Sequence, residues 1–136
     1  MSSPQTDAGS WRELSIGFDQ ALRELPDALK KEGFGIITEI DLQQTFKAKL
    51  GVDFRRYRVL GACNPGFALE ALQHDARVGV LLPCNVVLYE KDDGTTVVGA
   101  IDPMQTIGAQ AGGEALTELA GEVGARLQRA LTSLSG

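Results

Sequence analysis

The stretch "CNVVLYEKDDGTTVVGAID" (residues 84–102) decides the fold, because it places a turn signal between two β-rich runs. Asp93-Gly94 is typical of a type I′ turn, which joins two antiparallel strands through a two-residue loop. A loop of that length would pair Leu88 with Gly99. The stretch therefore predicts a β-hairpin near the end of the chain, with a defined register.

Strand-like and helix-like segments alternate on either side of this hairpin. Alternating side chains in residues 11–16, and β-branched or apolar runs in 34–40 and 56–63, predict three strands before it. Apolar residues at helical spacing predict helices between these strands and a long final helix after the hairpin. The order β-α-β-α-β-α-β-β-α favours an α+β fold: a single sheet of about five strands, with helices packed mainly on one face. The other face is then either polar or the interface with a partner.

Several helix ends carry capping signals. Asp41 and Gln44 match a capping box at the start of the second helix. Asn64 is a good N-cap for the third helix, and Pro65 suits its first turn. Gly33 fits the position that ends the first helix. These signals fix where helices begin and end.

Composition excludes some classes of function. A formal net charge of -5 over 136 residues argues against a nucleic-acid interface. No apolar run approaches the roughly 20 residues needed to cross a bilayer. Residues 1–10 have no basic start and no apolar core, so we expect a flexible leader there and a single domain over 11–136. The expected location is the cytoplasm, with free thiols.

Both cysteines precede asparagines, as Cys63-Asn64 and Cys84-Asn85. Two chain paths bring the thiols to one end of the sheet. In one, a strand from about Arg77 runs parallel to 56–63; in the other, a strand begins at Cys84 and runs antiparallel. We expect both thiols to line one pocket. A helix N-terminus beside Cys63 would also favour its thiolate. The alternative is that the cysteines are structural, because free cysteine is among the most buried residue types and packs as a small apolar side chain.

The chain also resembles a known family. The motifs "EGFGIITEIDLQQTFKAKLGVDFRRYRVLGACNPGFALEAL", "GVLLPCNVVLYE" and "IDP" are similar to a bacterial and archaeal family catalogued as domain of unknown function 302. The resemblance implies a compact α+β domain grouped with TATA-box-binding-protein-like folds, and a homodimer. It implies no established reaction, and the acidic charge gives no support for nucleic-acid binding.

The leading hypothesis is a cytoplasmic homodimer that binds a small ligand or metal ion, with no nucleic-acid or membrane partner. The predicted ligand-binding residues are Cys63, Asn64, Cys84 and Asn85, with Asp102 as a further contributor. One rival is a thiol-based redox sensor or enzyme that uses Cys63. Another is a structural homodimer module without a site. The sequence assigns no catalytic residue, metal or cofactor.

Overall fold

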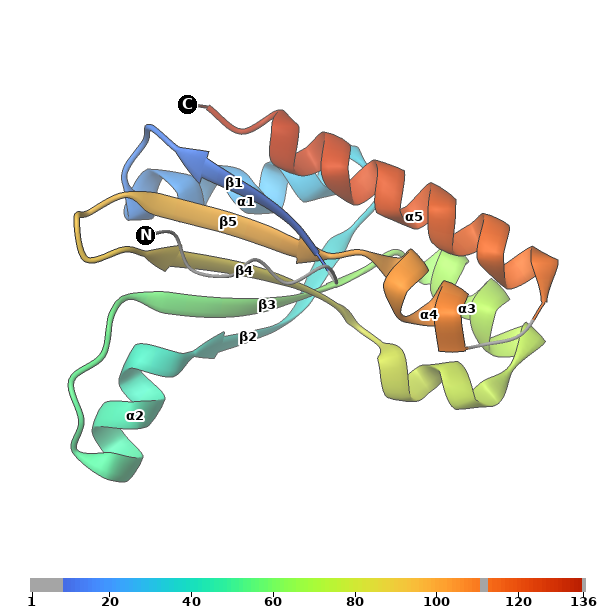
Figure 1. Ribbon diagram of the computed structural model, residues 1–136, viewed down its shortest axis with the longest axis horizontal. Coiled ribbons are helices and arrows are strands. Elements are labelled where there is room, and N and C mark those ends of the chain that lie inside the picture. Colours follow the sequence, from blue (N-terminus) through green and yellow to red (C-terminus); the bar gives the residue numbers. More distant parts are fainter. Residues whose placement is uncertain (1–8, 111–112, 136) are drawn as a thin grey trace.

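One antiparallel sheet with the strand order β1-β5-β4-β3-β2 forms the frame of the computed structural model (Figure 1). The structure describes residues 9–110 and 113–135. The predicted leader lies outside the described residues, except Gly9 and Ser10, which open the first strand. The elements are β1 (Gly9–Leu14), α1 (Phe18–Lys31), β2 (Gly35–Asp41), α2 (Leu42–Leu50), β3 (Tyr57–Cys63), α3 (Pro65–His74), the 3-10 helix η1 (Ala76–Leu81), β4 (Cys84–Glu90), β5 (Thr96–Ile101), the 3-10 helix η2 (Pro103–Gln105), α4 (Ile107–Gln110) and α5 (Glu114–Thr132).

Helices α1 and α5 lie side by side over one face of the sheet, and α3 and α4 lie at one end of α5 (Figure 1). Side chains from alternate strand positions meet α1 and α5 and form the main core. Its fully buried members include Leu25, Leu29, Leu60, Val86, Leu88, Val98 and Leu127. The predicted α+β fold, with a single five-stranded sheet and helices mainly on one face, is confirmed. None of the described helices is long and apolar enough to span a bilayer.

The predicted helix ends are confirmed by the local geometry. The Asp41 carboxylate accepts a hydrogen bond from the backbone N–H of Gln44 at 3.0 Å. Gly33 has a φ of +89° and follows the C-cap of α1. The backbone N–H of the next residue, Phe34, donates to the carbonyl of Leu29. This is the arrangement that satisfies the last carbonyls of a helix. It also aims the chain from α1 into β2.

The β4–β5 hairpin differs from the predicted one by one residue. Gly94 has a φ of +87°, but Asp93 does not have a positive φ, so the type I′ turn, which needs two such residues, does not form. Instead the N–H of Lys91 donates to the carbonyl of Thr95, across a three-residue loop. Leu88 consequently pairs with Val98, one residue short of the predicted partner.

The path between the cysteines is the antiparallel one. Residues 76–81 form η1 rather than a strand, and β4 begins at Cys84 and runs antiparallel to β3. The parallel alternative, with a strand starting at Arg77, is therefore wrong. Arg77 instead forms an ion pair with Asp75, whose carboxylate caps η1.

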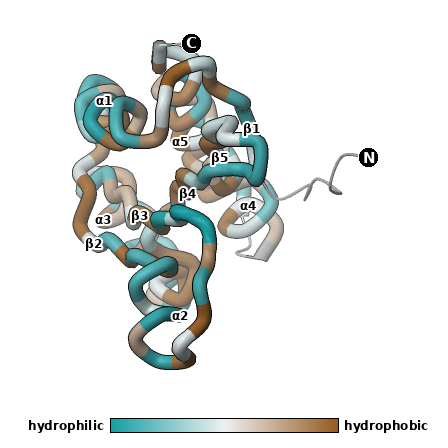
Figure 2. The backbone as a smooth tube through the Cα atoms, turned by 90° about the vertical axis from the view of Figure 1, so that its left-hand side faces the viewer, coloured by the Kyte–Doolittle hydropathy of each residue, from teal (hydrophilic) through white to brown (hydrophobic). Residues whose placement is uncertain are grey.

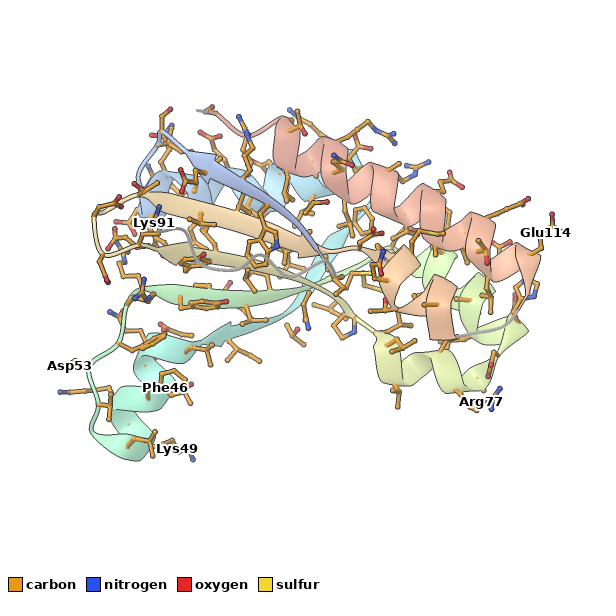
Figure 3. The ribbon with its side chains drawn as sticks, viewed as in Figure 1. Phe46, Lys49, Asp53, Arg77, Lys91 and Glu114 are labelled. Carbon is orange, nitrogen blue, oxygen red and sulfur yellow. The ribbon has the colours of Figure 1, made fainter. Side chains whose placement is uncertain are left out.

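The face of the sheet turned away from α1 and α5 carries several aromatic and aliphatic side chains. On it the rings of Tyr57 and Tyr89 stack with centroids 5.1 Å apart. Phe54 and Phe46 continue this aromatic row towards α2, which has no buried residue and stands apart from the other helices (Figures 2 and 3). Around α2 and the outer strand β2, the exposed large apolar residues are Ile37, Ile40, Leu50, Val52 and Phe54.

Candidate functional site

A cavity of about 30 Å³ lies where β3 ends and β4 begins, under α3 and α5. Its walls come from segments far apart in the sequence, and most of its lining is aliphatic or aromatic. The lining residues are Phe34, Ala62, Cys63, Asn64, Phe67, Ala68, Ala71, Leu82, Pro83, Cys84, Ile107, Leu119, Ala120 and Val123. No charged side chain is among them.

The structure brings the two cysteines together at this cavity. Cys84 pairs across the β3–β4 ladder with Ala62, the residue immediately before Cys63. Both thiols are free; Cys63 is half-buried at the end of β3, and Cys84 is buried at the start of β4. Antiparallel pairing places the end of one strand beside the start of the next, which is why residues 21 positions apart (84 minus 63) share one wall.

Burial determines the chemistry of Cys84. Loss of hydration raises the pKa of its thiol to about 11, and the neighbouring Cys63 adds to this shift. The thiolate is the nucleophilic form and the form that binds metals. Cys84 therefore stays a neutral, weakly polar thiol at physiological pH.

Asn64 links the cavity to helix α3. Its side-chain oxygen accepts a hydrogen bond from the backbone N–H of Phe67 at 3.3 Å, which confirms Asn64 as the N-cap. Its amide nitrogen faces Gly33, where a Cβ would lie only 2.7 Å away. The amide is thus held between the end of α1 and the start of α3, at the edge of the cavity.

Two of the predicted site residues lie elsewhere. Asn85 is exposed, pairs with Gly61 and points to the opposite face from Cys84, because successive strand residues alternate. Asp102 follows β5 and lines a separate hollow of about 240 Å³ with Ser10 and Gln128. Its carboxylate caps η2 by accepting from the N–H of Met104 at 3.0 Å. The expectation that Asn85 and Asp102 share the cysteine pocket is therefore wrong.

Sequence reasoning missed the aromatic side of the cavity and the arginine beside it. Phe34 and Phe67 line the cavity, and the Arg126 guanidinium lies 5.4 Å from the centre of the Phe67 ring. Arg126 is three residues after Val123 on α5, so both lie on the face that α5 turns to the cavity. The position of Arg126 three residues after an apolar residue of the last helix could have indicated that it lies beside the buried face of that helix.

The described residues offer no ready metal centre. Among them, no group of three or more His, Cys, Asp or Glu side chains is placed to hold a metal ion. His74, near the last turn of α3, is exposed and does not line the cavity. The lining residues with potential donor groups are Cys63, Asn64 and Cys84.

Comparison with known proteins identifies the family. The sequence pattern of the family described as "Domain of unknown function DUF302" matches residues 12–134. A solved structure, the uncharacterized conserved protein DUF302 from Bacillus stearothermophilus, is 30% identical to this chain. It superposes with a TM-score of 0.85, covering 93% of this chain and 98% of that one. Among curated proteins, none matches. The chain therefore belongs to the DUF302 family, the domain of unknown function whose motifs its sequence carries.

Proposed function

We propose that this protein binds a small molecule, or a short apolar group of a larger one, in the cavity between the two strand ends. The observation that supports this is a largely apolar pocket whose lining residues include both cysteines. Alanines at positions 62, 68, 71 and 120 leave the space open where larger side chains would fill it. The site is therefore built by small residues rather than by a packing defect at one position.

The size and lining of the cavity limit what it accepts. About 30 Å³ holds roughly two water-sized groups, since one needs on the order of 10–15 Å³. Apolar cavities stay dry and take up small apolar probes such as xenon. The neutral thiol of Cys84 fits an apolar guest better than a metal ion or a redox reaction, because both of those use the thiolate.

Xenon binding followed by NMR tests the proposal. Xenon should shift the backbone amide signals of residues that line the cavity, such as Ala71 and Val123. Ala68→Val adds two methyl groups to the cavity wall and should abolish these shifts. Ala115→Val, on the exposed side of α5, is the matched control and should leave them unchanged. Absent shifts, or shifts that persist in A68V, would contradict the proposal.

A second function, homodimerisation, is supported by the uncovered sheet face. Side chains of that face include Tyr57, Val59, Val87 and Tyr89, and the charge of Glu13 in β1 is paired with Lys91 just after β4. A nearly uncharged apolar face lets an acidic chain meet a second copy of itself without like-charge repulsion. We propose that this face, together with α2, packs against the same face of a second copy about a two-fold axis.

Measurement of mass in solution tests the dimer. Wild-type protein should sediment at twice the 14.5 kDa of one chain. Val87→Lys places a charge on the central strand of the uncovered face and should give monomers. Val80→Lys is the matched control, because Val80 is 90% exposed on η1, and it should leave the dimer intact. A monomeric wild type, or a V87K variant that remains dimeric, would rule out this interface.

A further inference from the structure

We infer that the molecule bound at the cavity is a small monocarboxylate: its short apolar tail enters the cavity and its carboxylate binds Arg126 and the Asn64 amide. This inference rests on the proposed ligand-binding function and names the class of ligand. The inference combines two features of the structure: an uncharged cavity, and hydrogen-bond donors of Arg126 and Asn64 close to its edge.

Arg126 has donors to spare at this position. Its two terminal nitrogens make contacts of 3.4 Å, one with the carbonyl of Glu32 and one with the carboxylate of Glu122. Its buried Nε has no hydrogen-bond partner among the described residues. A guanidinium carries five N–H donors in a planar fork that matches a carboxylate. The buried Nε is out of reach, but each terminal nitrogen makes only one long contact and keeps a second N–H for a ligand.

Gly33 brings Arg126 and Asn64 to one place. A Cβ on Gly33 would lie 2.7 Å from the Asn64 amide nitrogen and 3.9 Å from a terminal nitrogen of Arg126. Both donors therefore surround the same glycine, and the next residue, Phe34, lines the cavity. A side chain at position 33 would occupy the space that the donors share. The cavity thus has an apolar interior and a donor-lined edge, which fits an amphipathic ligand.

Charge and volume select a small monoanion. The cavity lining contains no carboxylate. The guanidinium of Arg126 already pairs with the carboxylate of Glu122, so its single positive charge would be shared between Glu122 and the ligand. That exposed i,i+4 pair is weak, so a ligand carboxylate can replace it. A dianion would meet repulsion from Glu122. A cavity of about 30 Å³ has room for a tail of roughly two carbons.

Propionate and propionamide are the matched probes, since they differ in charge but share the same two-carbon tail. Titration into the full chain, followed by NMR, should show propionate binding about tenfold or more tightly than propionamide. Arg126→Gln should remove this preference, because it weakens propionate binding more than propionamide binding. Arg129→Gln is the matched control, since Arg129 pairs with Glu32 on the surface, and it should retain the preference. Circular dichroism confirms that each variant is folded.

The outcomes separate this inference from the proposal it rests on. If propionate binds no better than propionamide, or if R126Q weakens both equally, the carboxylate assignment is wrong while the cavity still binds ligands. If xenon binds but neither acid nor amide does, the assignment is wrong as well. If no probe, xenon included, perturbs the lining residues, both proposals fall.

Discussion

The indole ring of Trp11 lies flat across Gly99, its partner on the neighbouring strand. A Cβ on Gly99 would overlap three carbon atoms of that ring. The absence of a side chain at position 99 therefore lets the edge strand β1 lay its one large aromatic residue over β5.

Gly99→Ala should lower the free energy of unfolding by about 1–3 kcal/mol, because the added methyl displaces the indole of Trp11. Urea denaturation of the variant and the wild type measures the difference. Gly35→Ala is the matched control, since a Cβ on Gly35 in β2 would meet nothing within 4 Å. Equal destabilisation by both substitutions would show that the Trp11 contact is not responsible.

The parts of the fold that depend on local chemistry could be predicted from the sequence. The caps at Asp41 and Asn64 and the glycine after α1 each satisfy backbone groups within a few residues, so their signals are local. The alternation of strands and helices likewise follows from the spacing of apolar residues. These features were sufficient for the α+β class and for the position of each cysteine at a strand end.

The errors arose where one residue of register decides the outcome. The backbone of Asp93 keeps a negative φ, so the loop has three residues and the β5 pairing shifts by one. Asn85 follows the site residue Cys84 directly, yet strand alternation turns it to the other face. Asp102 lies after the strand end and serves as a cap in another hollow. None of these placements follows from spacing alone, because each depends on tertiary pairing.

Loss of the α3 cap should measurably weaken the wall of the cavity. Asn64→Ala leaves the N–H of Phe67 without its acceptor and should cost about 0.5–2 kcal/mol of unfolding free energy. Asn64→Asp keeps an acceptor oxygen at that position and should stay close to wild type. Thermal or urea unfolding checks both variants. If N64D were as unstable as N64A, the cap would not explain the loss.

Arg12 ties the edge strand to the end of the last helix. One of its terminal nitrogens donates to the carbonyls of Leu131 and Leu134, at 2.7 and 2.8 Å. These charge-assisted bonds also place a cation at the negative end of α5. Arg12→Met keeps much of the aliphatic stem and should lower the free energy of unfolding by roughly 1.5–3 kcal/mol.

Hydrogen exchange locates the effect of this Arg12→Met substitution. Amide protection should fall in the last turn of α5, near Leu131, while the distant β2–β3 pair keeps its relative protection. Arg23→Met is the matched control, because Arg23 is exposed on α1. An R12M variant as stable as R23M would show that the carbonyl contacts contribute nothing.

The buried thiol of Cys84 should make the protein less stable at alkaline pH. Burial raises the pKa of Cys84 from its ordinary value of 9.0 to about 11. Between these values the unfolded chain has lost the thiol proton while the folded chain keeps it, so the free energy of unfolding falls as pH rises. The stabilising contribution is complete below about pH 9 and is lost by about pH 11, a change of roughly 2–3 kcal/mol.

Burial also raises the pKa of Tyr57, so the wild-type slope alone is not specific to the thiol. Cys84→Ala removes the thiol but leaves Tyr57, and urea unfolding across this range should show a shallower slope for the variant. Parallel slopes for C84A and wild type would mean that the thiol of Cys84 ionises normally in the folded protein.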